Sequence, residues 1–169
     1  MNRRGHQLAA VTVTLAVLPP ATTPLIVGVV VGVASATSHG WLSPDVDQRV
    51  SWLAHRTLTH TLEVVLTAGT LAVALAYHLG APWIGWGVAI GWGSHLLADM
   101  AFGGIPSVLL GGQRTVKRRS SYRGTIRSRY RVQTRRVGFH LRTGGPAEHA
   151  AYGILPVVIV VLIFLRFFA

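Results

Sequence analysis

The few acidic residues of this chain lie close to histidines. The 169 residues include only five acids, alongside eight histidines. A soluble surface normally carries many scattered carboxylates. Carboxylates this scarce, placed beside imidazoles and between apolar stretches, are typical of ligands for a metal ion. The five acids are Asp45, Asp47, Glu63, Asp99 and Glu148.

His95 and Asp99 form the most specific pair, near the end of an apolar stretch. A spacing of four residues puts both side chains on one face of a helix. An imidazole nitrogen and a carboxylate oxygen placed in this way can bind one ion, or the carboxylate can bridge two. A hydrogen-bonded pair at a helix end is the simpler interpretation. We favour the metal because ionisable groups within membrane segments are costly and usually functional.

The segment HRTLTH repeats this pattern before the third apolar stretch. His55 and His60 are five residues apart, so we expect one just before a helix and the other in its first turn. Either can ligate a metal, and the other can orient a carboxylate or act as acid or base. Arg56 is either a cationic anchor at the membrane face or a clamp on an anionic substrate, since its planar fork suits phosphate.

The other candidates have weaker patterns. Asp45 and Asp47 form a Pro-Asp-x-Asp segment, and loops also use Asp for turns. The nearby histidine motifs make both aspartates candidate ligands. His6 is either an interfacial residue or a ligand at the start of the first helix. Glu148 either complements the N-terminus of the last helix or belongs to the site, and the scarcity of acids favours the site.

Composition indicates a membrane protein. Half of the residues are hydrophobic and 12% are charged, against about 25% charged in an ordinary soluble domain. A single domain of this length cannot bury so much apolar surface in a core of its own. The chain contains no cysteine, which excludes disulfides and thiolate zinc sites, so any metal must use nitrogen and oxygen ligands.

Five apolar stretches predict an all-α, polytopic membrane protein, a single domain over residues 1–169. The last three stretches approach the roughly 20 residues needed to cross a bilayer. The first two are shorter, and we interpret them as a helical pair joined at Pro19-Pro20. The stretches are Leu8–Leu18, Pro24–Ala36, Leu58–Leu79, Trp83–Ala101 and Ala147–Phe168.

The basic residues predict the orientation. Eleven of the sixteen Lys and Arg residues fall between Arg114 and Arg142, within a basic loop at 111–145. Such loops favour the cytoplasmic face. Counting five spans from this loop places the N-terminus inside and the C-terminus outside. The candidate metal residues then gather at the cytoplasmic interface of the cell's inner membrane.

In order, the segments GHQLA, SPDVD, HRTLTHT, SHLLADMAFGGIP and TGGPAEHA resemble the YdjM-like family of LexA-binding, inner-membrane-associated metal-dependent hydrolases. The match runs along nearly the whole chain. The family is thought similar to zinc phospholipase C and P1-type nuclease, which cleave phosphoesters with clustered zinc ions. The resemblance implies metal ligation by His6, Asp45, His60, His95 and Asp99, with His55, Asp47 and Glu148 as candidates.

The chain departs from the family pattern at four positions. Thr61 replaces the usual serine and keeps its hydroxyl, and Gln48 stands where the family often has histidine. Phe102 and Gly103 occupy positions that are often Thr and Pro, so the edge of the pocket differs there. None of these changes removes an expected ligand.

The first functional hypothesis is a membrane-bound, metal-dependent hydrolase that cleaves a phosphoester or phospholipid by metal-activated water. His55 or Glu148 would act as general acid or base, and Arg56 would hold the anionic group. Mixed imidazole and carboxylate ligands favour Zn²⁺, with Mn²⁺ as the alternative.

The second hypothesis is a non-catalytic membrane anchor with a structural metal, whose basic loop binds nucleic acid, anionic lipid or a protein partner. Arginine interleaved with tyrosine in this loop suits contacts with phosphates and bases. Simple attraction of the loop to anionic lipid is the preferred explanation. An ion or proton transporter is disfavoured, because the polar residues gather at one face instead of crossing the membrane.

Overall fold

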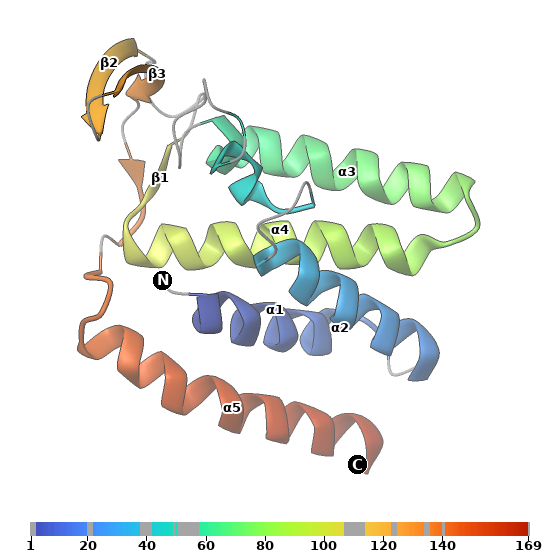
Figure 1. Cartoon of the computed structure of the whole chain (residues 1–169). Helices are drawn as coiled ribbons and strands as arrows, with labels where there is room; N and C mark the ends of the chain where they lie inside the picture. The colour runs from blue at the N-terminus through green and yellow to red at the C-terminus, as the bar shows by residue number, and fades with distance from the viewer. Residues whose placement is uncertain are drawn as a thin grey trace.

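The structure is a computed structural model that describes residues 3–19, 22–37, 42–48, 50, 58–106, 114–122, 125–133, 136–139 and 141–168. This part of the chain is chiefly helical (Figure 1). Five α-helices coincide with the five predicted apolar stretches to within a few residues. The elements are α1 (Arg3–Val17), α2 (Thr22–Thr37), η1 (Pro44–Gln48), η2 (Leu58–His60), α3 (Leu62–His78), α4 (Pro82–Phe102), β1 (Ile105–Pro106), β2 (Arg114–Tyr122), β3 (Thr125–Gln133), β4 (Arg136–Val137) and α5 (Pro146–Phe167).

Helix α4 is the centre of the bundle. It packs against α1, α2 and α3, whereas α5 packs mainly against α1 (Figure 1). Small residues bring α2 and α4 very close together. A Cβ atom on Gly91 would lie 2.0 Å from the Ser35 hydroxyl and 2.4 Å from the Gly32 carbonyl. Only glycine therefore fits at position 91, and the close approach fixes how α2 lies on α4.

Local sequence features fix where the central helices begin. The Thr61 hydroxyl caps α3 by accepting a hydrogen bond from the Val64 amide at 3.3 Å. Pro82 lies in the first turn of α4, where a missing N–H costs nothing. His60 consequently ends up just before α3.

Arg166, near the end of α5, connects the last helix to the first. Its guanidinium donates hydrogen bonds to the carbonyls of Leu18 and, at 2.7 Å, Ala16. The last carbonyls of a helix have no partners within the helix itself. Arg166 therefore satisfies the C-terminal end of α1 from another part of the chain.

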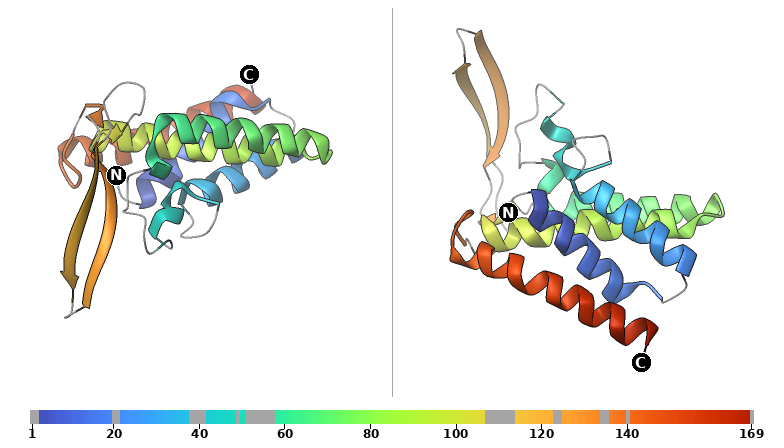
Figure 2. Two further views of the ribbon diagram at one scale, coloured as in Figure 1. Left: turned by 90° about the horizontal axis from the view of Figure 1, so that it is seen from above. Right: turned by 60° about the horizontal axis from the view of Figure 1, so that its bottom comes forward.

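The predicted all-α class is confirmed for the helical bundle, and the basic segment at 111–145 adds a β-hairpin that the sequence analysis did not predict. Strands β2 and β3 pair antiparallel, and β1 pairs with β4 below them. The hairpin extends away from the helices (Figure 2). The β-branched and aromatic residues of its two strands favour this strand pairing.

One helix in the described part of the chain is long and apolar enough to cross a membrane. This is α5, with 22 residues and a mean hydropathy of 2.4. Helices α1, α2 and α3 have 15, 16 and 17 residues, fewer than the roughly 20 that a bilayer requires. Helix α4 has 21 residues, but its tryptophans, glycines and His95–Asp99 pair make it less apolar. The helix lengths thus do not support the predicted five spans.

If α5 is the membrane anchor, a charge at its centre will weaken membrane attachment. Val157 is 62% exposed, so Val157→Arg introduces no clash within the bundle. An arginine there costs about 2.5–3.5 kcal/mol on insertion. We expect the variant to shift from the carbonate-resistant membrane fraction to the soluble or aggregated fraction. The control Phe168→Arg, at the helix end, should stay in the membrane, and equal retention of both variants would rule out α5 as the anchor.

Candidate metal centre

Residues from four helical elements meet at one end of the bundle. Helix α4 supplies His95 and Asp99, α1 supplies His6, η1 supplies Asp45 and η2 supplies His60. The three histidines and Asp99 are each at most 5% exposed, and the Asp45 side chain is 16% exposed. The structure therefore brings together the five residues that the family resemblance implied as metal ligands.

The carboxylate of Asp99 faces three histidines. Its Oδ1 atom lies 3.7 Å from His6 Nε2. Its Oδ2 atom lies 3.5 Å from His95 Nε2 and 3.7 Å from His60 Nε2. A carboxylate that uses its two oxygens toward different histidines can hold one ion or bridge two.

Asp45 faces two of the same histidines. Its Oδ1 atom lies 3.3 Å from His60 Nε2 and 3.8 Å from His95 Nε2. The segment that carries it is fixed to α4, because the Trp92 indole donates a hydrogen bond to the Leu42 carbonyl at 2.5 Å. Asp45, His60 and His95 form one group of converging ligand atoms, and His6, His95 and Asp99 form another.

The spacing of these atoms suits a metal better than hydrogen bonds. Most of the separations exceed the 2.7–3.2 Å of a good N–H···O bond. Two ligands each about 2.1 Å from a tetrahedral ion lie about 3.4 Å apart. The ligand atoms of each group lie within 4.8 Å of one another. In the described part of the chain, the buried Nδ1 atom of His6 also has no hydrogen-bond partner.

Two histidines have their outer nitrogens fixed by neighbours. His95 Nδ1 donates to the Ala36 carbonyl at the end of α2, at 2.6 Å. His60 Nδ1 lies 3.3 Å from Asp47 Oδ2, and this carboxylate also accepts a hydrogen bond from Thr59 at 2.9 Å. Such contacts fix the ring orientation and tautomer of a metal-binding histidine. Both Nε2 atoms are thereby directed into the cluster.

Asp47 differs from the other predicted ligands. It lies on the outer side of His60 and belongs to neither group of converging atoms. In this geometry it orients His60. Ring stacking also orients His6, whose ring centroid lies 4.0 Å from that of His95 with an interplanar angle of 8°.

The carboxylates control the protonation of His60. Burial alone would lower the pKa of this imidazole. Hydrogen bonds to Asp45 and Asp47, together with the charges of Asp47 and Asp99, outweigh burial and raise the pKa to about 9. Without metal, His60 is therefore protonated at neutral pH and partly offsets the surrounding negative charge.

Of the three predicted catalytic residues, Glu148 is the one that lies within the described part of the chain. His55 and Arg56 lie outside the described residues. Glu148 is buried at the start of α5, where it accepts hydrogen bonds from the Gly144 amide at 2.6 Å and from the Tyr152 hydroxyl. It belongs to neither group of metal-ligating atoms. Its contacts organise the first turn of α5, and sequence reasoning missed Tyr152 as its partner.

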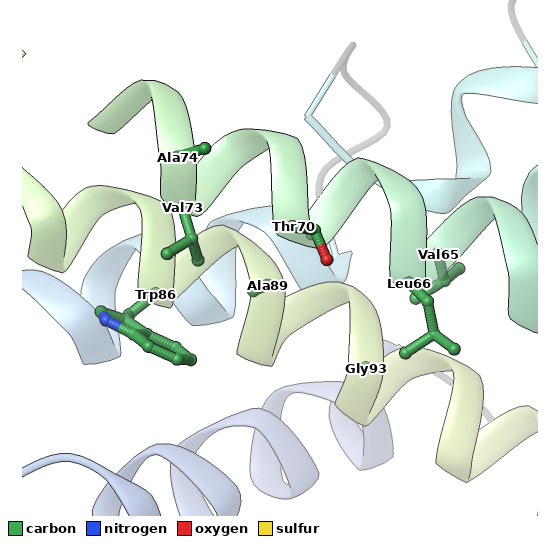
Figure 3. Close-up of a pocket in the computed structure, with 9 residues that line it drawn as sticks. Val65, Leu66, Thr70, Val73, Ala74, Trp86, Ala89 and Gly93 are labelled. Atoms are coloured by element: carbon green, nitrogen blue, oxygen red, sulfur yellow. The ribbon is translucent and has the colours of Figure 1, made fainter. Parts of the chain in front are cut away.

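A groove between α3 and α4 lies apart from this chemistry (Figure 3). Its volume is about 390 Å³, and none of its lining residues belongs to the metal-ligating groups. The walls are apolar except for Thr70, so they offer no group for acid–base or metal chemistry. Its lining includes Val65, Leu66, Val73, Trp86 and Ala89.

The chain matches no known protein-family model, no curated protein and no solved structure. The resemblance to the YdjM-like family therefore stays a prediction. The case for a metal centre depends on the geometry of the histidines and aspartates.

The metal content of the purified protein tests this site directly. We expect zinc or manganese to co-purify with the full chain, and His95→Ala and Asp99→Ala each to lose most of it, because both residues belong to the converging set. His78→Ala is the matched control, since His78 is exposed at the far end of α3. Elemental analysis showing the same metal content in all four folded proteins would contradict the assignment.

The affinity for metal should rise with pH. An ion that binds His60 must displace its proton, and with a pKa of about 9 that proton is present throughout the neutral range. Affinity should therefore increase about tenfold per pH unit from pH 6 to 8 and level off near pH 9. An ordinary histidine would level off near 6.5. Competition with a chelator of known affinity at each pH would show which behaviour occurs, and a flat profile above pH 7 would contradict the prediction.

Proposed function

We propose that this protein is a membrane-bound, metal-dependent hydrolase that cleaves a phosphoester or phospholipid. The observation that carries the proposal is the convergence of three imidazole Nε2 atoms with the oxygens of Asp45 and Asp99. This nitrogen and oxygen set suits Zn²⁺, with Mn²⁺ as the alternative. Hydrolysis is the chemistry that such sites commonly support when a coordination position stays open.

A divalent ion held here would lower the pKa of a bound water and neutralise charge on a phosphoryl oxygen. One or two ions would be held by His6, Asp45, His60, His95 and Asp99. Asp47 and the Ala36 carbonyl would keep the rings of His60 and His95 in the ligating orientation.

A second groove supports a substrate with an apolar tail. It lies between α1, α4 and α5, has a volume of about 480 Å³ and is lined mainly by apolar side chains. Ser94 and Ala98 in its wall directly precede His95 and Asp99 in α4. Ala9 is one turn of α1 beyond His6. A lipid tail in this groove would bring its phosphate near the cluster.

The proposed setting is the inner membrane, crossed more than once, with the cluster facing the cytoplasm. The start of α3, the end of α4 and the start of α5 lie at the same end as the basic hairpin (Figure 1). Helix α3 also exposes Leu66, Leu71 and Leu75. Large apolar side chains outside α5 support contact with lipid by more than one helix.

The general acid or base and the substrate clamp are proposed from the sequence. His55 or Glu148 would transfer a proton, and Arg56 would hold the anionic group of the substrate. For Glu148, burial and the hydrogen bond from the Tyr152 hydroxyl support a role in proton transfer.

The alternative function is a non-catalytic anchor with a structural metal, whose basic segment binds nucleic acid, anionic lipid or a protein. The projecting hairpin favours this alternative. The two functions differ in whether substitution of a proposed metal ligand abolishes hydrolysis.

Hydrolysis assays on a small soluble phosphoester and a panel of phospholipids would decide between them. Asp45→Asn should lose both metal and turnover, by about 100-fold or more, because it removes a ligand charge. Arg56→Lys keeps the charge but loses the planar fork, so it should retain metal and turn over an anionic substrate roughly tenfold more slowly. Replacing Arg127, Arg129 and Arg131 together should leave turnover of the small substrate nearly unchanged. Full activity of Asp45→Asn alongside a dead hairpin variant would favour the anchor.

A further inference from the structure

The register of the β2–β3 hairpin sorts its basic residues by face. Arg118 pairs with Arg129, Ser120 with Arg127 and Val116 with Arg131. Alternate residues along a strand belong to the same face of the ladder. Five arginine positions therefore share one face, hereafter the arginine face, and the opposite face has two basic positions, Lys117 and Arg119. The arginine face comprises Arg114, Arg118, Arg127, Arg129 and Arg131.

This distribution is unfavourable for a hairpin on its own. Like charges placed directly opposite one another destabilise an antiparallel pair, and Arg118 stands opposite Arg129. A two-stranded hairpin is at best marginally stable in water. The sequence has no acidic residue between Asp99 and Glu148 to compensate. An anionic partner would relieve the repulsion and stabilise the hairpin.

The position of the hairpin indicates where that partner lies. Pairing of β1 with β4 ties its base to the end of α4, close to where α5 begins (Figure 1). Both views in Figure 2 show the hairpin running across the direction of α4 and α5, not along it. Helix α5 is the described helix that can cross a bilayer. A hairpin that runs across this helix at its N-terminal end follows the membrane surface.

We infer that the β2–β3 hairpin lies along the membrane surface and binds anionic phospholipid headgroups through its arginine face. Each strand has nine residues, or roughly 30 Å at about 3.3 Å per residue, which is enough to cover several headgroups. Guanidinium groups bind phosphate oxygens in pairs. Nucleic acid offers similar phosphates, but the placement across α5 favours the membrane. The inference concerns a separate surface and does not require hydrolysis.

Single cysteines can test the two faces, because the chain has none of its own. Ser120→Cys lies on the arginine face, and Ser128→Cys lies on the opposite face at a neighbouring level. The full chain, labelled with an environment-sensitive fluorophore, would be reconstituted in nanodiscs of phosphatidylcholine with or without phosphatidylglycerol. We expect the label at 120 to be shielded from acrylamide only with phosphatidylglycerol, and released by high salt. The label at 128 should be quenched equally in both lipids.

A charge-matched pair of variants separates a specific face from general attraction. Arg118→Gln/Arg129→Gln and Lys117→Gln/Arg119→Gln each remove two positive charges, one pair from each face. Each basic residue near an anionic surface contributes about fivefold to binding. The first variant should therefore bind phosphatidylglycerol about 25-fold more weakly, and its label at 120 should no longer be shielded. The second should keep most of its binding.

Three results would overturn the inference. Equal loss in the two variants would show diffuse attraction without a binding face. Absence of shielding at 120 in phosphatidylglycerol would exclude the membrane as partner. Shielding at 120 by duplex DNA in neutral nanodiscs, without any effect of phosphatidylglycerol, would identify nucleic acid as the ligand instead. None of these measurements uses turnover, so their outcome is independent of the proposed hydrolase.

Discussion

The close crossing of α2 and α4 is the constraint on which the geometry of the candidate metal centre depends. Gly91 lets the backbone of α2 approach so closely that the Ala36 carbonyl reaches His95 Nδ1 at 2.6 Å. Since a carbonyl can only accept, Nδ1 must carry the hydrogen, and Nε2 is left to face the cluster. The orientation of the central ligand thus follows from a glycine one turn earlier in the same helix.

Burial makes this arrangement costly without charge compensation. His60, Asp47 and Asp99 are each at most 3% exposed, and an isolated charge there would be strongly unfavourable. The cluster solves this by pairing two carboxylates with opposite nitrogens of one imidazole. The same pairing raises the pKa of His60 to about 9, so a proton and a bound ion would compete for one position. Three of the five acids of the chain, Asp45, Asp47 and Asp99, lie at this cluster.

Sequence was a good guide to the helices and to the ligand types, because both depend on local features. Apolar stretches predicted all five helices, and the scarcity of acids pointed to all five acidic residues, of which Asp45 and Asp99 lie in the converging groups. It could not identify the Ala36 carbonyl, since every residue has one and only the packing of α2 on α4 selects it. The orienting position of Asp47 likewise depends on which nitrogen of His60 it meets. The hairpin was missed because its high charge hid the alternation of strand-forming residues.

The hydrogen bonds from Arg166 connect the end of α5 to the end of α1, and α1 carries His6. Helix α1 is a rigid rod of 15 residues with His6 near its first turn and the Arg166 contact just beyond its last. Because Arg166 contacts the end of α1, a change in the position of Arg166 would alter the tilt of α1 and with it the position of His6. Fusion tags or truncations at the C-terminus would therefore displace His6, even though they lie at the opposite end of the bundle from the candidate metal centre.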